Sequence, residues 1–203
     1  MSEALDTLAS QVLEFWFGEH DGQSVPEHKA DMWFRNGRDY DSIVREQFAH
    51  RLDPAAAGAF DEWAESAAGR LALIIILDQF PRHIHRDRAR AFAFDAKARE
   101  HCLAGLSSEQ DQSLSPIERT VFYLPLEHAE DLALQERSVA MYEALCANVS
   151  DNVVEQFEAN LGYAAAHRDI IARFGHFPHR NHLIGRPLTA AHKAFLKEPN
   201  SSF

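Results

Sequence analysis

The sequence predicts an all-α fold, on two observations. Apolar residues recur with a period close to 3.6 along almost the whole chain. No set of short alternating segments separated by turns, the pattern typical of a β-sheet, is present. The 203 residues are 46% apolar and include 14 Phe and 3 Trp, which is enough to build a core. We therefore expect one all-helical domain over residues 1–203.

Four helices are expected in the first part of the chain. Residues 4–17, 39–51 and 55–67 each carry apolar residues at helical spacing. Leu71 to Leu77 is apolar throughout, and its three consecutive isoleucines would also suit a buried strand. Because no partner strand is in view, we expect a central buried helix there. Phe80-Pro81 is expected to end it.

Helix signals continue in the middle of the chain. Asp95 is a plausible N-cap for a helix over 96–105. Ser115-Pro116-Ile117-Glu118 combines a capping box with proline at the first helical position. Pro125 removes a backbone donor, so it should break or kink that helix. A new helix over about 126–147 would follow.

The last long helix is expected over 152–174 and should end at Gly175, a natural left-handed C-cap position. On a helical wheel Arg168 lies in the middle of the apolar face. Either its stem reaches an edge of that face, or the guanidinium is buried and needs an acidic partner, because an unpaired buried charge is costly. Glu127 and Asp131 are the leading partner candidates.

The net charge, the N-terminal sequence and the cysteines indicate which partners and which location the protein has. A net charge of −11 disfavours general attraction to nucleic acid or to anionic membranes. The N-terminus is acidic where a secretory signal is basic, and no apolar run approaches the ~20 residues that span a bilayer. Cys102 and Cys146 are interpreted as reduced core thiols. We expect a cytoplasmic location, and the oligomeric state is left open.

The segment Glu127-His128-Ala129-Glu130-Asp131 is the most informative feature. Helical spacing would place Glu127, His128 and Asp131 on one side of a helix. Two carboxylates and an imidazole can transfer protons, hold a metal or bind an arginine, so these three are the candidate catalytic residues. The simpler interpretation is that the carboxylates only favour the positive end of a helix.

The sequence gives little support for a metal or cofactor site. His176, His179 and His182 have three-residue spacing that suggests a metal site, but their segment contains Phe-Pro and is not expected to be helical. His83 and His85 are weaker candidates. No di-iron repeat, P-loop, dinucleotide fingerprint or Gly-x-Ser-x-Gly elbow is present. We therefore expect no metal and no cofactor.

Four strings resemble the signatures of domain-of-unknown-function family 924: 12–18, 77–82, 123–131 and 167–181. The resemblance implies an all-α, tetratricopeptide-like antiparallel array of about eight to ten helices with no established activity. The chain departs from the family strings at His176, where Arg is usual, and at Ala129, where Ser is common. No repeat of about 34 residues is traceable, so a peptide-binding groove would rest on fold analogy alone.

The leading hypothesis is a polar pocket for a small anionic ligand, in which arginines bind the anion and Glu127 or His128 orients it. The resembling strings supply its expected ligand-binding residues, which are Asp78, Gln79, Arg82, His167, Arg168, His179, Arg180 and Asn181.

Three alternatives remain. The polar residues can form an internal salt-bridge network within a protein- or peptide-binding module. Glu127 or His128 can act as acid or base in an enzyme of unknown reaction, with Arg168 or Arg180 stabilising negative charge. An aromatic surface around Trp33 can bind a protein partner, although such residues are more often core. A network should be sealed, whereas a ligand site should line a cleft with an arginine donor unused.

Overall fold

The computed structural model describes residues 7–199 and 201, and it confirms the all-α prediction. No strand is found among these residues. Nine helices of six or more residues and two of five residues are present. They are α1 (Thr7–Phe17), α2 (Glu27–Phe34), α3 (Gly37–Phe48), α4 (Leu52–Ala56), α5 (Ala67–Ile74), α6 (Phe80–Ile84), α7 (Asp95–Ser107), α8 (Pro116–Glu127), α9 (Leu132–Cys146), α10 (Val154–Phe174) and α11 (Ala190–Phe195). Residues 4–6 of the first expected helix lie outside the described residues.

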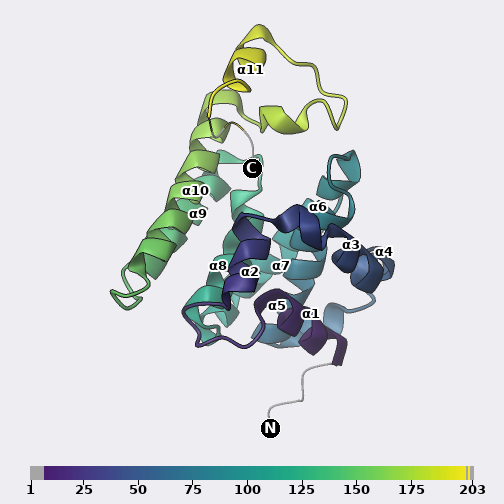
Figure 1. The fold of residues 1–203 in the computed structure, drawn as a ribbon, viewed down its shortest axis with the longest axis vertical. Coiled ribbons are helices and arrows are strands. Elements are labelled where there is room, and N and C mark those ends of the chain that lie inside the picture. Colours follow the sequence, from purple (N-terminus) through teal and green to yellow (C-terminus); the bar gives the residue numbers. More distant parts are fainter. Residues whose placement is uncertain (1–6, 200, 202–203) are drawn as a thin grey trace.

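Helix α5 lies at the centre of the fold. It packs against α1, α7 and α8, and its four residues Leu71–Ile74 are completely buried. Helices α9 and α10 form a long hairpin along one side (Figure 1). A second, smaller core joins the end of α10 to the C-terminal segment through Ile170, Ile171, Phe177 and Phe195. None of the helices in the described part combines the length and apolar character needed to cross a bilayer.

Phe80-Pro81 does not end the central helix, contrary to the prediction. The backbone passes from α5 through a π-helical turn, Ile75–Gln79, directly into α6. In this turn the amide of Phe80 donates to the carbonyl of Ile75, five residues earlier. Pro81 follows in the first turn of α6, where its missing N–H is tolerated. The wider turn therefore lets the chain continue past proline, and it places Asp78 in the interior.

Pro125 does not break α8 either, and the expected helix over 126–147 was wrong at its start. Helix α8 continues to Glu127, and the amide of His128 still bonds to the carbonyl of Leu124 at 2.9 Å. Pro125 removes one backbone hydrogen bond, and the helix ends two residues after it. Asp131 is the N-cap of α9, accepting from the amide of Leu134 at 3.1 Å. Glu127, His128 and Asp131 therefore do not share one helix face.

Of the other predicted helix boundaries, some are confirmed and some are wrong. The capping box at Ser115 and the left-handed C-cap at Gly175, with φ of +72°, are both present. Asp95 is the first residue of α7 and not its cap. The helix expected over 55–67 is interrupted at Gly58, whose φ of +85° is a conformation that glycine adopts easily and other residues do not.

The aromatic segment at the end of α2 is mostly core. Met32 is buried, and Trp33 stacks on Trp16 with ring centroids 5.7 Å apart. Phe34 is half exposed and stacks on Tyr163 at 6.3 Å. Only a small apolar surface is therefore left for the protein-binding hypothesis. The two cysteines are free thiols, and of these only Cys102 is fully buried.

Candidate functional site

Asp78 and His128 form the innermost pair of the polar region. Asp78 is completely buried in the π turn, and His128 follows the last residue of α8. Nδ1 of His128 lies 2.9 Å from each Asp78 carboxylate oxygen. Burial alone would raise the pKa of Asp78, but Arg82 and His128 outweigh it and hold the pKa well below its usual range. Burial and Arg82 lower the pKa of His128. Neutral His128 therefore donates from Nδ1, and Nε2 carries the lone pair.

Asp95 joins two arginines from distant parts of the chain. Arg82 holds it in a bidentate pair, with Nη1–Oδ1 and Nη2–Oδ2 distances of 2.9 and 3.1 Å. Arg180 donates from Nη1 to Oδ2 at 3.2 Å, and its guanidinium lies over the rings of Phe92 and Phe177. Burial and the nearby Arg82 lower the pKa of Arg180 to about 10. Arg180 remains charged at neutral pH and is held between α7 and the C-terminal segment.

Glu127 and His167 form a second buried pair. Nδ1 of His167 lies 3.1 Å from Oε1 of Glu127 and 2.9 Å from the carbonyl oxygen of Tyr163. Each side chain is about 5% exposed. Burial raises the pKa of Glu127 to about 8 and lowers the pKa of His167 to about 3. Both groups are therefore uncharged at neutral pH.

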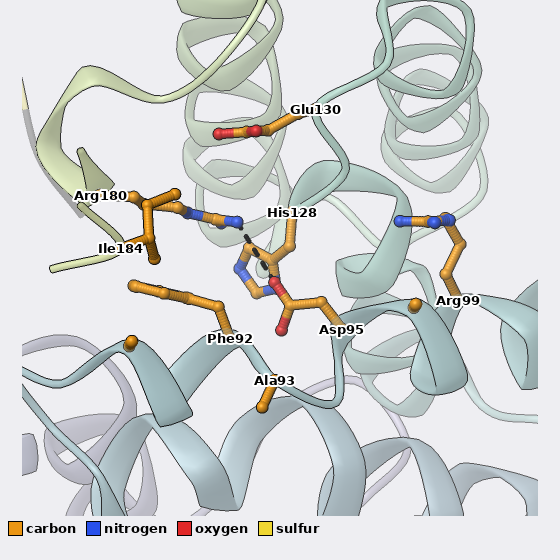
Figure 2. Close-up of a pocket in the computed structure, with 10 residues that line it drawn as sticks. Phe92, Ala93, Asp95, Arg99, His128, Glu130, Arg180 and Ile184 are labelled. Carbon is orange, nitrogen blue, oxygen red and sulfur yellow. Dashed lines mark hydrogen bonds and ion pairs between the residues drawn. The ribbon is translucent and has the colours of Figure 1, made fainter. Parts of the chain in front are cut away.

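A cleft of about 420 Å³ opens beside these pairs (Figure 2). One wall is the start of α7 with the residues before it, and the facing wall comes from the α8–α9 connection and the C-terminal segment. The lining residues are Ala89, Phe92, Ala93, Asp95, Ala96, Arg99, His128, Glu130, Arg180 and Ile184. His128 is thus the point at which the buried pairs reach the cleft.

Two further lining residues define the rim of the cleft. Glu130 accepts a bidentate pair from Arg186 at 3.0 and 2.8 Å and a hydrogen bond from the amide of Phe177 at 2.9 Å. This attaches the C-terminal segment to the α8–α9 connection. Arg99, on the first turns of α7, makes no hydrogen bond or ion pair with any other described residue.

The comparisons with known proteins give a family and no activity. The family model described as "Bacterial protein of unknown function (DUF924)" matches residues 12–200. The chain belongs to this family. It is similar to the solved structure of a protein of unknown function, ATU0120, from Agrobacterium tumefaciens, with 33% identity, a TM-score of 0.79, and coverage of 94% of this chain and 97% of that one. No curated protein matches.

In this DUF924 chain, Arg168 lies outside the site. Its side chain is 36% exposed and bonds to the neighbouring Asp169, so of the two expected arrangements Arg168 adopts the one at the edge of the apolar face, and Glu127 and Asp131 are not its partners. The buried face of α10 keeps Phe157, Ala164 and Ile171 as expected, and His167 takes the inward position in place of Arg168. Asp131 is exposed and serves as a cap.

Three more predicted residues surround the site rather than line it. Gln79 donates to Asp78 Oδ2. Asn181 is completely buried and donates to the carbonyl of Pro187 at 3.3 Å, which stabilises the C-terminal loop. His179 packs on Phe177 with ring centroids 5.6 Å apart, and burial lowers its pKa to about 4.

The three-histidine spacing does not produce a metal cluster in the part of the chain that is described. His182 is exposed, and the ring of His176 packs on His192 with centroids 4.9 Å apart. Another group has metal-binding composition: Glu127, His128 and His167, whose ligand atoms all lie within 4.8 Å of one another.

Sequence reasoning missed Phe92, Arg99 and Glu130 as cleft residues and assigned Asp95 only to capping. Asp95 and Arg99 share the first turns of α7, a carboxylate and a guanidinium four residues apart near a dense run of arginines. Glu130 stood inside the string singled out as most informative. These signals were present, but the pairings of Asp95 and Glu130 join segments 13 to 85 residues apart in sequence.

Proposed function

We propose that the cleft binds a small anionic ligand through Arg99 and Arg180. The observation that carries this proposal is the unused donor capacity of these arginines. Arg180 donates one hydrogen bond, from Nη1 to Asp95, and its Nε has no partner among the described residues. Arg99 faces the same space (Figure 2). A guanidinium has five N–H donors, so both arginines keep donors that an anionic ligand can use.

The charges around the cleft support an anion. Four guanidinium groups are gathered there, from Arg82, Arg99, Arg180 and Arg186. Three carboxylates, those of Asp78, Asp95 and Glu130, face them. The excess is positive in a chain whose net charge is −11. The first turn of α7 also lines the cleft, and a helix N-terminus favours negative charge.

Size and lining indicate the class of ligand. A volume of about 420 Å³ lies within the ~300–1,000 Å³ typical of small-molecule pockets. Phe92 and Ile184 add apolar surface on the side opposite Arg99 (Figure 2). We infer a metabolite-sized carboxylate or phosphate with a short apolar part. A cytoplasmic location is part of the same proposal, since metabolites of this kind are abundant there.

A sealed structural network explains the contacts of Arg82 but not those of Arg99 and Arg180. Arg82 makes a bidentate pair with Asp95 and also contacts Asp78, so its donors are used internally. Arg180 makes one hydrogen bond to Asp95, and Arg99 makes none within the described residues. Arg82 therefore fits the network interpretation, whereas Arg99 and Arg180 fit a ligand site.

The test is calorimetric titration at low salt with phosphate, sulfate, citrate and succinate. We expect at least one of these anions to bind the wild type and Arg99→Gln to weaken that binding about tenfold, which corresponds to loss of one charge-assisted hydrogen bond. Arg38→Gln is the matched control, because Arg38 is 72% exposed and pairs with Asp87 away from the cleft. Binding that is equal in wild type and Arg99→Gln, or absent for all four anions, overturns the proposal.

A further inference from the structure

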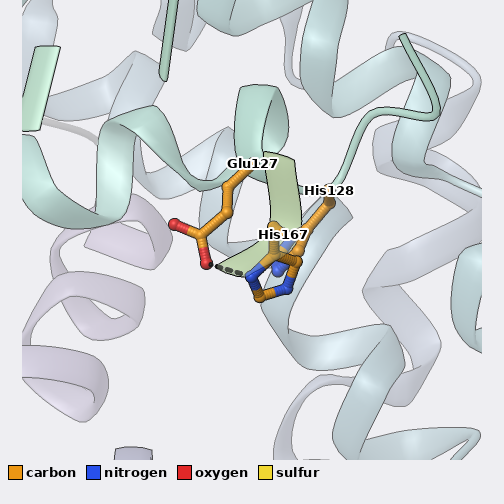
Figure 3. Close-up of side chains that lie close together, drawn as sticks. All are labelled: Glu127, His128 and His167. Carbon is orange, nitrogen blue, oxygen red and sulfur yellow. Dashed lines mark ion pairs between the residues drawn. The ribbon is translucent and has the colours of Figure 1, made fainter. Parts of the chain in front are cut away.

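We propose that Glu127, His128 and His167 form a binding site for a divalent transition metal ion at the floor of the cleft. The three residues come from the end of α8 and from the middle of α10. Their side chains point toward one another in Figure 3, and one ligand atom from each lies within 4.8 Å of the others. Among the described residues this is the one group of three with such composition.

Both histidines are held in the tautomer that metal binding requires. Nδ1 of His128 donates to the ionised carboxylate of Asp78 at 2.9 Å. Nδ1 of His167 lies 2.9 Å from the carbonyl oxygen of Tyr163, which can only accept, so this nitrogen carries the proton. In each ring Nε2 is then the nitrogen with the lone pair. Metal-binding histidines are typically oriented in this way, by a carboxylate or a backbone carbonyl on the other nitrogen.

Glu127 supplies the third ligand. It is 4% exposed, and its Oε1 lies 3.1 Å from Nδ1 of His167. Its position beside both imidazoles gives the carboxylate oxygen that a metal ion would need as a third protein ligand. The hydroxyl of Tyr142, which donates to the carbonyl of Thr120 at 2.7 Å, lies beside the Glu127 carboxyl.

The ligand set indicates the kind of metal. Two imidazoles and one carboxylate are the protein ligands of many catalytic zinc sites and of non-haem iron(II) sites. Ligand atoms on one zinc ion lie about 3.4 Å apart, as expected for metal–ligand distances near 2.1 Å. The widest separation here, up to 4.8 Å, would have to close by about 1.4 Å. Nδ1 of His167, and not Nε2, is the nitrogen 3.1 Å from Glu127, so a rotation of the His167 ring would have to bring Nε2 to the metal.

The position of the site leaves room for a further ligand. His128 lines the cleft, whereas Glu127 and His167 are buried behind it. A metal held by all three would therefore have its open side toward the cleft. The proposal does not depend on anion binding by Arg99 and Arg180, because neither arginine belongs to the metal ligand set.

The experiment uses the full chain, stripped with a chelator and then titrated with zinc(II) or cobalt(II) alone. We expect one equivalent to bind to the wild type. Glu127→Gln and His167→Asn should each weaken binding by at least tenfold, with far-UV circular dichroism unchanged. His176→Asn is the matched control, because that residue belongs to the separate histidine pair with His192. Loss of binding in His176→Asn, with Glu127→Gln unaffected, overturns the proposal.

A second measurement covers the case in which a variant does not fold. X-ray absorption of the zinc-loaded wild type counts the imidazole ligands directly, and two are expected. A spectrum with fewer than two, or no stoichiometric zinc binding by the wild type, contradicts the site. Retained metal binding in Arg99→Gln, together with lost anion binding, would show that the two proposals succeed or fail separately.

Discussion

Nδ1 of His128 donates to the carboxylate of Asp78 across 50 residues of sequence, at 2.9 Å from each oxygen. This contact exists because the π turn places Asp78 in the interior at the level where α8 ends. The same carboxylate faces Arg82, so one buried aspartate supports both the arginine network and the imidazole at the cleft. The contact therefore connects the centre of the fold with its candidate site.

The first prediction concerns the stability of a variant at Arg168, whose side chain is partly exposed. Arg168→Leu should change the free energy of unfolding by less than about 1 kcal/mol, because its partner Asp169 is a solvent-exposed sequence neighbour. Asp78→Asn is the contrasting variant and should cost about 3–5 kcal/mol, since it leaves Arg82 in a buried site without one of its carboxylates. Urea unfolding measures both. Equal losses in the two variants would contradict the assignment of Arg168 to the surface.

The pair of Asp41 with Arg86 predicts a pH dependence of stability. Burial alone would raise the pKa of Asp41, but hydrogen bonds from Arg86 and His83 outweigh it and hold the pKa below its usual range. A carboxyl whose pKa is lowered by folding contributes stability above its unfolded pKa, near 4, and loses it as the pH falls through the folded pKa.

Asp41→Asn should therefore lower the free energy of unfolding by about 2 kcal/mol at pH 7. The difference from wild type should remain constant down to about pH 5 and shrink below pH 4. Urea unfolding across this range, with Asp87→Asn as a surface control, measures it. A difference that is still undiminished at pH 3 would rule out the proposed role of this pair.

Replacing Gly105 or Gly162 with alanine should change the stability of the protein in opposite directions. A Cβ added at Gly105 would lie 2.5 Å from Cζ of Phe122 and 2.6 Å from Cδ of Arg70, so Gly105→Ala should destabilise the protein by about 1–3 kcal/mol. A Cβ at Gly162 would meet nothing within 4 Å, and Gly162→Ala should stabilise α10 by about 0.5–1 kcal/mol. Thermal unfolding of the two variants should give melting temperatures on opposite sides of the wild type.

Much of the fold was predictable from local signals. The capping box at Ser115 and the glycine at 175 mark helix ends through contacts within a few residues, which a single sequence displays. Pro81 and Pro125 were misjudged because the effect of proline depends on what surrounds it. A π turn places Pro81 in the first turn of α6, and α8 accommodates Pro125 two residues before its end, so neither proline stops its helix where expected. The spacing of apolar residues along the sequence reveals neither arrangement.

The sequence predicted which residues gather at the candidate site, but not which of them pair with one another. Asp78, Arg82, His128, His167 and Arg180 do lie in one region. Their pairings could not be predicted, because each depends on how segments distant in sequence pack together. Arg168 and His167 show the limit most clearly. They are neighbours in sequence at one edge of the apolar face of α10, His167 is the buried one, and a helical wheel cannot resolve a difference of one residue.

The attachment of the C-terminal segment to Glu130 has a consequence for protein synthesis. The ribosome makes Asp78, Asp95 and His128 well before Arg180 and Arg186, so the cleft is completed only after the central helices have been made. Until then Asp95 has only Arg82 as its partner, and Glu130 has none of its contacts with the C-terminal segment. The central helices of a nascent chain are thus made before the residues that complete the cleft.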